Sequence, residues 1–508
     1  MSMKREARAA MTPTPPRRIP CTVLLCALST LAGCAVGPDY QRPAVAAPAQ
    51  YKELSAWKVA EPSDEAPRGN WWEIYGDAQL NALVAQVEVA NQNVAAAAAQ
   101  YRQARAVVAA ARAAWFPVIA TDFTLSRGQG TVGTSATAAS NAVIVGAPIR
   151  NTARLSLDAS WEADVWGRIG RGVESDTAAA QASAADLQAA LLSAQAALVQ
   201  AYIELRINDA QQRLLDETVV AYQRSLQITR HRYAAGVAAR LDVAQAETQL
   251  KATEAQAIDL GVQRGQLEHA IALLMGRAPA DFALPPTDTL PLLPQIPVGL
   301  PSALLERRPD VAAAERRAAA ANAQIGVAQA AFFPALTFSA SGGYQTSSLS
   351  QLLTLPNRFW SLGPALALTL FDAGARSARK EQAMAAYDQS VAGYRQAVLT
   401  AFQDVEDNLV ALRILAEEAV VQREAAQFAA ESLRLTDNQY RSGTVSYLNV
   451  VITQAAALAT QRNSLDITGR RLLASAALQK ALGGDWRAAE TTEQETSLMA
   501  SHRIREGL

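Results

Sequence analysis

The sequence predicts a mixed α and β fold that is built from two tandem structural repeats. Residues 233–243 hold a Gly-centred turn that returns 207 positions later at residues 440–450, which indicates a duplicated architecture. Apolar residues recur at helical spacing over stretches much longer than the helices of ordinary soluble proteins. Four further stretches alternate between apolar and small or polar residues, as strands with two different faces do.

The N-terminal segment, residues 1–33, is predicted to be a lipoprotein signal peptide. Five basic residues precede a short apolar region at 21–31, which is the order found in signal peptides. The following Leu31-Ala32-Gly33-Cys34 resembles the lipobox of bacterial lipoproteins, and this resemblance implies cleavage before Cys34 and acylation of that residue. Residue 35 is Ala rather than Asp, which by the same analogy favours the outer membrane. An ordinary signal peptide with a chance Cys is the alternative.

Composition narrows the class of protein. The chain has 508 residues, of which 18% are charged and 50% hydrophobic, and its net charge of −1 gives nucleic-acid binding no support. No apolar run of about 18 residues follows the signal segment, so no transmembrane helix is expected in the mature chain. The three Cys all lie at or before Cys34 and the three His are scattered. We therefore expect no disulfide framework, no metal site and no cofactor.

Three linking segments lack a helical or strand period. Residues 34–76 are predicted to be an N-terminal anchor and extended segment, with Trp57, Trp71 and Trp72 as packing residues. Residues 277–301 contain seven Pro and are expected to form a rigid, extended connector. Residues 485–508 are polar and are expected to be a mobile C-terminal tail.

The first repeat, residues 77–276, begins with an Ala-rich helix over 77–114 that ends before Pro117. Alternation then predicts strands around 119–126 and 155–162, with a polar loop over 127–152 between them.

The longest helix of this repeat is predicted from Gly167 to Tyr233. It has about 65 residues, or a length on the order of 100 Å, and its apolar residues step by four and three in a coiled-coil-like seam. Gly236 allows the left-handed backbone that ends a helix. Asp242 is expected to be the N-cap of the next helix, which runs to Gly276.

The second repeat, residues 302–484, returns these elements in the same order. Its strands are predicted around 336–344 and 366–370, with a shorter loop over 345–359, and Asn449 stands where the first repeat has Asp242. Each repeat therefore has the order helix, strand, strand, helix, turn, helix. Equivalent glycines at an offset of 207 are Gly167 and Gly374, Gly236 and Gly443, and Gly276 and Gly483.

The strands have one apolar face and one small, polar face, which is the pattern of membrane β-barrels. Four strands cannot close a barrel, and open sheet edges are not tolerated in lipid. Either the sheet belongs to a soluble domain or several chains combine their strands; three chains would supply twelve, enough for a barrel with a lumen. Helices of about 100 Å exceed the roughly 30 Å apolar layer of a bilayer, so they must extend into water.

Several motifs together resemble the outer-membrane efflux channels of the TolC/OprM type, in their lipoprotein branch. With the two turns, these motifs span nearly all of residues 34–485. They are Cys34-Ala-Val-Gly-Pro-Asp-Tyr-Gln-Arg-Pro43, Asn70-Trp71-Trp72, Leu304-Leu-Glu-Arg-Arg-Pro-Asp-Val311, Ala330-Ala-Phe-Phe-Pro334 and Leu370-Phe-Asp-Ala-Gly374.

The resemblance implies a homotrimer in which a twelve-stranded β-barrel crosses the outer membrane and a long α-helical barrel of twelve helices extends into the periplasm. It implies a passive duct that exports drugs or other small molecules, held among outer-membrane lipids by the N-terminal anchor. It also implies docking to a periplasmic adaptor and an inner-membrane pump, usually of the resistance–nodulation–division class.

In such channels the two turns close the periplasmic end. Asp242 from three chains would form an electronegative ring, unless it serves only as a helix cap. Leu448 would form an apolar plug, because Val445 and Ile452 stand where relatives often have Arg and Asp. The predicted gate consists of Arg240, Asp242, Tyr440, Arg441, Leu448 and Asn449, and the turn that the adaptor contacts includes Tyr233, Gly236 and Gly443.

Two other classes of protein are weaker alternatives. A periplasm-spanning lipoprotein without a lumen would have similar helices. An enzyme would need a nucleophile–base constellation or a phosphate loop, and the sequence shows neither. The string Arg307-Arg308-Pro309-Asp310 is interpreted as a helix start, because Pro and Asp are both favoured in a first helical turn. We therefore expect no catalytic residue.

Overall fold

The computed structural model describes residues 35–45, 48, 51–52, 70–129, 149–287, 289–294 and 308–484. These residues form two compact units. The sheet unit holds the described residues within Met1–Asp39, Ala110–Glu174 and Asn322–Met384, and the helix unit holds those within Tyr40–Ala109, Ser175–Ala321 and Ala385–Leu508. Each repeat contributes to both units.

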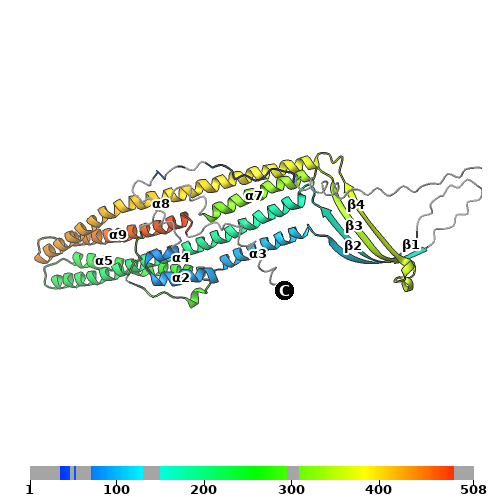
Figure 1. Ribbon diagram of the computed structural model, residues 1–508. Helices are drawn as coiled ribbons and strands as arrows, with labels where there is room; N and C mark the ends of the chain where they lie inside the picture. Colours follow the sequence, from blue (N-terminus) through cyan, green and yellow to red (C-terminus); the bar gives the residue numbers. More distant parts are fainter. Residues whose placement is uncertain are drawn as a thin grey trace, which may run out of the picture. The chain divides into compact units, whose positions relative to one another are not determined.

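The sheet unit contains one antiparallel sheet whose strands lie in chain order (Figure 1). The strands are β1 (Val118–Gln129), β2 (Ile149–Ala163), β3 (Ala335–Thr346) and β4 (Arg358–Ala367). The prediction of two strands in each repeat is confirmed. The loop over 127–152 was predicted too long, because β1 continues to Gln129 and β2 begins at Ile149, where the two strands still pair.

The bounds predicted for the fourth strand, 366–370, are wrong. Strand β4 begins at Arg358, inside the predicted loop over 345–359, and it ends at Ala367. Leu368 and Leu370 continue the alternating pattern but follow the strand. Ala367 pairs with Ala335, which is the first residue of β3, so the neighbouring strand offers no backbone beyond that point.

The register divides the side chains of the sheet between two faces. Asp122 pairs with Ser156, Ser156 with Gly343 and Gly343 with Phe359, so these positions share the polar face. The other face carries large apolar side chains that one chain leaves exposed, where a soluble sheet would bury such a face. This face therefore has the pattern of a lipid-facing surface. Its exposed members include Ile119, Phe123, Leu125, Leu157, Trp161, Phe338, Trp360, Leu362 and Leu366.

The described helices confirm the predicted order in each repeat. Helix α4 has 67 residues and α8 has 68, so the very long helix is present twice. The helices are α2 (Ala78–Ala90), α3 (Gln92–Ala113), α4 (Arg168–Ala234), α5 (Arg240–Leu274), α7 (Pro309–Ala330), α8 (Ala375–Ser442) and α9 (Tyr447–Ala481). Short 3-10 turns are η2 (Trp71–Tyr75), η3 (Pro279–Asp281), η4 (Leu349–Gln351) and η5 (Leu355–Asn357).

The single helix predicted over 77–114 is divided into α2 and α3 by Asn91. The backbone of Asn91 is extended, with φ −69° and ψ 123°, and its Oδ1 accepts the N–H groups of Asn93 and Val94 as a helix cap does. Its Nδ2 donates to the carbonyl of Leu274 at 2.7 Å. A side chain that satisfies two helix ends at once favours the break over a continuous helix.

The six glycines that mark the repeat all have left-handed backbones. Their φ angles are 77° and 89° before the long helices, 75° and 81° in the turns, and 65° and 89° after α5 and α9. Gly is the residue that adopts this conformation without steric strain. The duplication seen in the sequence is therefore a duplication of backbone conformation. The pairs are Gly167 and Gly374, Gly236 and Gly443, and Gly276 and Gly483.

The helix unit buries its N-terminal aromatic residues. Trp71, Trp72 and Tyr75 lie in an apolar cluster with residues of α2, α4, α5 and α9, which confirms the packing role of both Trp; Trp57 lies outside the described residues. Tyr202 of the same cluster donates to Asp77 at 2.7 Å. Burial, together with that hydrogen bond to a carboxylate, raises the pKa of Tyr202 to about 12, so the phenol stays neutral.

A buried Arg fixes the Pro-rich connector to the helices. The guanidinium of Arg206, which is 1% exposed, donates to Asp209 at 2.9 Å, to the Pro285 carbonyl at 3.0 Å and to Gln79 at 2.6 Å. A buried charge is stable only with such partners. The connector is thus part of the packed unit at this point.

The helix start predicted at Arg308-Pro309-Asp310 is confirmed, since α7 begins at Pro309. Arg308 pairs with Asp310 at 2.7 Å and with Asp404 of α8 at 2.8 Å. Burial alone would raise the pKa of Asp310, but the hydrogen bond and charge of Arg308 hold it below its usual value. This string joins two helices of the second repeat; Arg307 lies outside the described residues.

Among the described helices, α4 alone has the length and composition to cross a membrane. A long core helix of a soluble protein can have the same length and composition, and 39% of the apolar 18-residue stretch of α4 is buried. Leu198, Tyr202 and Leu205 of α4 are fully buried in the helix unit. Packing against other helices accounts for its apolar residues.

We expect Gly276→Ala to lower the melting temperature and Gly265→Ala to leave it unchanged or raise it. A Cβ at Gly276 would overlap the Ala90 carbonyl oxygen, and a left-handed backbone is unfavourable by about 1–2 kcal/mol for a residue with Cβ. Gly265 lies inside α5 with open space around it, where Ala favours the helix by roughly 0.5–1 kcal/mol. Circular dichroism melting of detergent-purified protein measures both, and equal melting temperatures would contradict this account.

Candidate functional site at the helix turns

The turns between α4 and α5 and between α8 and α9 have the same backbone. Gly236 and Gly443 have φ of 75° and 81°. In each turn the N–H of the residue after Gly donates to the carbonyl five residues earlier, at 2.8 and 3.0 Å. This hydrogen bond belongs to the Schellman motif, which satisfies the free carbonyls at a helix end. The tight reversals predicted from the sequence are confirmed.

Asp242 is not the N-cap residue, so that prediction is wrong. Ala239 is the N-cap of α5, and the Asp242 carboxylate reaches back from the third helical position to accept the Ala239 N–H at 3.3 Å. This is the arrangement by which an acidic residue in a first turn satisfies a free N–H. Asn449 has the same position in α9, where Ser446 is the N-cap. The equivalent positions therefore differ in charge but not in place.

A small apolar cluster lies behind the turns, and two tyrosines give it polar contacts. The Tyr440 hydroxyl donates to Thr229 of α4 at 3.3 Å, and its ring meets the Tyr447 ring edge-on at 5.2 Å between centroids. The Tyr447 hydroxyl lies 3.2 Å from that of Ser225, and burial raises the pKa of Tyr447. Both hairpins thus share one core. Its members are Tyr222, Leu226, Val243, Ala246, Leu250, Tyr440, Tyr447 and Val450.

Arg232 links the two turns, although it was not among the residues predicted for the gate or the adaptor contact. Its guanidinium carbon lies 4.8 Å from the centroid of the Tyr440 ring, and its Nη1 donates to the Arg441 carbonyl at 2.9 Å. The Arg441 side chain itself pairs with Asp437 at 2.7 Å. A basic residue in the last turn of a helix is ordinary by itself. Only the folded chain shows that it reaches a partner 209 positions away.

The predicted apolar plug and adaptor-contact residues lie at the solvent-exposed end of the turns. Leu448 is 49% exposed, Leu241 65% and Tyr233 45%. Arg240 is exposed, and within the described residues it makes no ion pair with Asp242.

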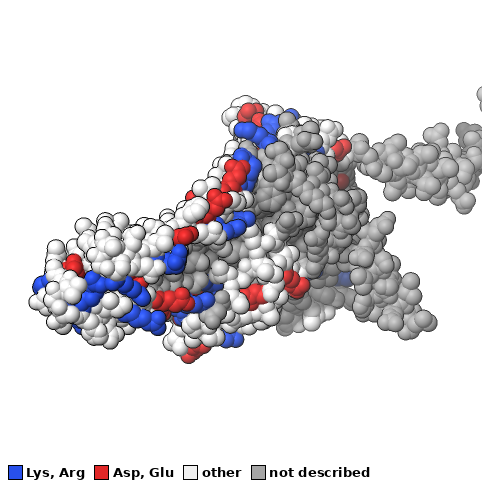
Figure 2. All heavy atoms as spheres, turned by 90° about the vertical axis from the view of Figure 1, so that its left-hand side faces the viewer, with Lys and Arg blue, Asp and Glu red and all other residues white. Residues whose placement is uncertain are grey.

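The two hairpins differ strongly in charge. Residues 235–254 carry two Lys or Arg and three Asp or Glu, whereas the equivalent residues 442–461 carry none of these. Arg230 donates to Glu247 at 2.7 Å, and this hydrogen bond holds the pKa of Glu247 below its usual value. Figure 2 looks at the chain from the side of the turns and shows both basic and acidic side chains there, with large uncharged areas between them.

Cys34 lies outside the described residues, but the residues that follow it are placed. The Val36 N–H donates to the Trp166 carbonyl at 3.1 Å, and Ala35 lies against Gly167. Both contacts are a few residues beyond the end of β2 at Ala163. The segment next to the predicted lipid anchor therefore begins beside the sheet. Among the residues that the structure places, no group of three or more His, Cys, Asp or Glu side chains is arranged to hold a metal ion.

Comparison with known proteins agrees with this architecture. Residues 83–277 and 300–484 match the family described as "Outer membrane efflux protein", as two segments in tandem. Among curated proteins, the chain is 31% identical to the pyoverdine export outer membrane protein OpmQ of Pseudomonas aeruginosa, over 91% of this chain and 96% of OpmQ. It is 30% identical to the toluene efflux pump outer membrane protein TtgC of Pseudomonas putida, over 90% and 93% of the two chains.

A solved structure shows the same fold. The outer-membrane channel OprN superposes with a TM-score of 0.82 at 31% identity, covering 89% of this chain and 99% of OprN. The family match, the alignments to the two relatives and this superposition each cover most of both repeats of this chain. This chain belongs to the outer membrane efflux protein family and is an outer-membrane efflux channel.

Proposed function

We propose that three copies of this chain form a passive, lipid-anchored duct that is closed at its periplasmic tip by the inter-helix turns. The observation that carries the proposal is the sheet, in which, within the described residues, the terminal strands β1 and β4 each pair on one side only. Its apolar face is exposed along all four strands. A membrane accommodates that face but not the open edges, because unpaired backbone groups have no water to bind there.

Closure by three chains resolves both problems. If β4 of one chain pairs with β1 of the next, twelve strands form a continuous barrel with an apolar exterior and a polar lumen. A barrel has no edge. The same three-fold axis would bring three copies of each turn together, with Asp242 and Leu448 near the axis. The linked pair Arg232 and Tyr440 would make the two hairpins of one chain move as one body.

The partners follow from the turns and from the relatives. Exposed Tyr233, with the turns at Gly236 and Gly443, gives a periplasmic adaptor a surface to contact. An inner-membrane pump would supply the energy, because a duct of this kind has no reaction of its own. TtgC is named for toluene and OpmQ for pyoverdine, two unlike compounds, although both resemble this chain to the same degree. This supports a duct that leaves the choice of substrate largely to the pump.

The lipid anchor is proposed at Cys34. Ala35 lies against Gly167, close to the end of β2, so acyl chains on the preceding residue would reach the inner leaflet beside the barrel wall. This placement fits an anchor that holds the barrel without spanning the membrane itself.

The oligomer and the lumen are tested together on purified full-length protein. We expect light scattering in detergent to give three times the mass of one mature chain, and planar bilayers to show ion conductance. A trimer that does not conduct would favour a structural, periplasm-spanning lipoprotein. A monomer would contradict the shared barrel.

For the gate, we expect Asp242→Asn and Asp242→Ala both to raise the conductance carried by anions, because each removes one negative charge per chain from the proposed ring, which repels anions. Asn keeps an oxygen that can accept the Ala239 N–H, whereas Ala does not. Asn449→Ala, at the uncharged equivalent position, is the matched control. If only the Ala variant differs from wild type, and it differs by a lower melting temperature, Asp242 is a helix-stabilising residue and not a gate.

For the anchor, we expect Cys34→Ser to abolish incorporation of labelled palmitate and to leave residues 1–33 uncleaved. Mass spectrometry of the purified protein measures both changes. Cys26→Ser lies within the predicted signal peptide and serves as the control, since its mature product should be unchanged. An identical mature mass for Cys34→Ser and wild type would disprove lipidation at this residue.

A further inference from the structure

The two β-hairpins of the sheet are related by fixed offsets in the sequence. Phe116 precedes β1 and Phe333 precedes β3, 217 positions later. Gly167 follows β2 and Gly374 follows β4, 207 positions later. A residue of β1 therefore has its equivalent 217 positions further on in β3, and a residue of β2 has its equivalent 207 positions further on in β4.

The two hairpins also pair in the same register. Val118 of β1 pairs with Ser160 of β2. Their equivalents at these offsets, Ala335 of β3 and Ala367 of β4, pair with each other. The duplication therefore preserves strand pairing residue by residue, so the offsets can be used to transfer a register from one pair of strands to its equivalent.

Strands β2 and β3 join the two repeats within one chain. They pair without interruption from Ala153 opposite Thr346 to Ala163 opposite Leu336. Strand β4 is the equivalent of β2, and β1 is the equivalent of β3. Within the described residues, β4 and β1 each leave one edge without a partner strand. When three chains close the barrel, β4 of one chain and β1 of the next therefore meet as the equivalents of a joint that each chain already contains.

The two offsets transfer the register of this joint to the meeting of two chains. The equivalent of Ala163 is Leu370, and the equivalent of Leu336 is Ile119. Because Ala163 pairs with Leu336, Leu370 of one chain would lie opposite Ile119 of the next. The whole β4–β1 pairing between chains follows from this one pair, since antiparallel strands pair residue by residue from there.

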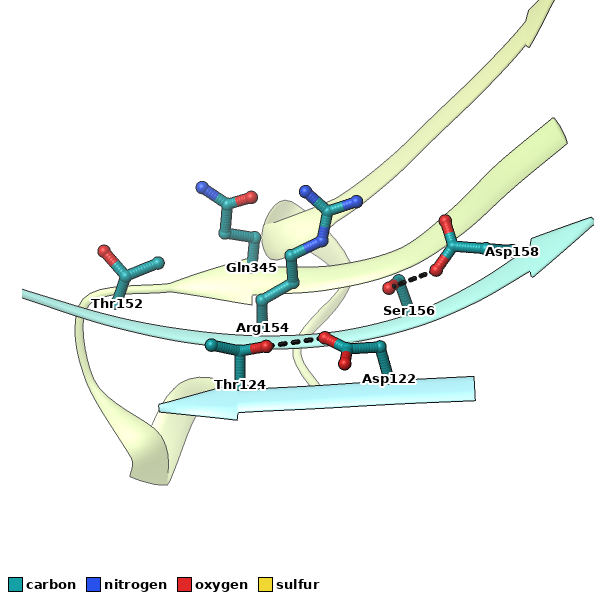
Figure 3. A pocket seen from close by; sticks show the side chains of 7 residues that line it. All are labelled: Asp122, Thr124, Thr152, Arg154, Ser156, Asp158 and Gln345. Carbon is teal, nitrogen blue, oxygen red and sulfur yellow. Dashed lines mark hydrogen bonds between the residues drawn. The ribbon is translucent and has the colours of Figure 1, made fainter. Parts of the chain in front are cut away.

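The transferred register matches the two faces of the strands. Asp122 and Thr124 of β1 point to the polar side of the sheet, the same side as the labelled residues of β2 and β3 (Figure 3). The register places Thr124 opposite Ala365, which lies on the polar face of β4. It places Phe123 opposite Leu366, and both lie on the apolar face. A slip of one residue would set apolar side chains of one strand beside polar side chains of the other.

Residues 368–370 follow β4 and lack a partner strand among the described residues of one chain. Strand β3 begins at Ala335 and provides no backbone beyond its pair with Ala367. Leu368 is 48% exposed and Leu370 is 86% exposed. The free edge of β1 extends further, because the transferred register sets its residues 119–121 opposite 370–368. The alternating pattern that continues through Leu370 would then have a strand to pair with.

We propose that β4 of one chain pairs with β1 of a second copy in the register that sets Leu370 opposite Ile119, and that this pairing extends β4 through residues 368–370. The inference rests on the proposed duct, because the two edges meet only when chains share one barrel. It adds the register of the joint between chains and three residues of strand that a single chain does not form.

The proposed register makes all six joints between repeats alike, three within chains and three between them. In a closed barrel the stagger of neighbouring strands is linked to their tilt and to the barrel width. Equal joints therefore give the strands of both repeats the same tilt. Leu368 and Leu370 would add to the apolar outer face at the end of the barrel next to the helices, and Thr369 would face the lumen.

The test is disulfide formation between chains of the full-length protein, purified in detergent and mildly oxidised. The mature chain has no Cys other than Cys34, which is proposed to be acylated, so the introduced thiols are the free ones. Thr369→Cys with Ala120→Cys reports on the extension, and Ala365→Cys with Thr124→Cys reports on the register within β4. Residues directly opposite each other on neighbouring strands are close enough for a disulfide.

We expect both pairs to give covalent species of two and three times the mass of one chain on non-reducing gels. Thr369→Cys with Ile119→Cys is the matched control. Ile119 lies next to Ala120 but on the opposite face, so this pair should give no more linked product than the single variants.

Three outcomes would count against different parts of the account. A wild-type protein with the mass of a monomer would refute the duct itself. A trimer in which neither predicted pair is linked would overturn the register. Linkage of Ala365→Cys with Thr124→Cys alone would overturn the extension of β4.

Hydrogen exchange of the wild-type trimer is a second measurement that needs no variant. Backbone N–H groups that pair with a neighbouring strand exchange slowly, whereas those of an exposed segment exchange fast. We expect residues 368–370 to be protected to the same degree as β4. Exchange as fast as that of an unstructured peptide would overturn the extension even if the cysteine variants failed to fold.

Discussion

Backbone hydrogen bonding at the two edge strands of the sheet is the constraint on which the rest of this structure depends. Strands β1 and β4 each have one row of N–H and C=O groups that no other strand pairs with among the described residues. Water would satisfy them, but the apolar face of the sheet excludes water, because it carries side chains such as Trp360 and Leu362 that are about three-quarters exposed in one chain. Lipid satisfies the face and leaves the edges unpaired at several kcal/mol for each group. Only closure with further strands meets both demands.

The duplicated backbone meets this constraint by using the same local geometry twice. Each repeat supplies two strands and the same left-handed glycines, so one set of turn and junction geometries serves twice. Chemical detail then differs between the copies. Asp242 and Asn449 have the same position in their helices, yet only one carries a charge. The Arg232 side chain of the first hairpin reaches the backbone of the second, so the copies are also physically joined.

Features that depend on local periodicity could be predicted from the sequence. The strand pairs, the very long helices and the turns at Gly236 and Gly443 follow from alternation, helical spacing and Gly placement, each of which is encoded within a few residues. The boundaries that were wrong depend on distant partners. Helix α2 ends at Asn91 because its side chain also binds the carbonyl of Leu274, and β4 ends where β3 begins. Alternation continued through Leu368 and Leu370, so no local signal could show that end.

Prediction of the candidate site was limited in the same way, by contacts between residues far apart in the sequence. The turn residues and the exposed Leu448 could be located from the sequence. Asp242 was predicted to be the N-cap but is the third residue of its helix, because a carboxylate can accept a free backbone N–H from either position. Arg232 was missed because its partners, Tyr440 and the Arg441 carbonyl, are more than 200 residues away. In the sheet, Arg154 of β2 contacts the Phe359 ring of β4, two strands away, and no periodicity in one strand encodes that contact.

The uneven charge of the two hairpins has a consequence for stoichiometry. A ring of three chains would present six hairpins of two kinds in alternation, one kind with five charged residues over 235–254 and the other with none over the equivalent residues 442–461. A partner that forms a three-fold ring could bind one kind of hairpin alone. A partner that forms a six-fold ring would meet two chemically different binding sites. Its subunits would have to bind both kinds of site or adopt two conformations. In such a ring the duplication would make the tip nearly six-fold in backbone shape and three-fold in chemistry.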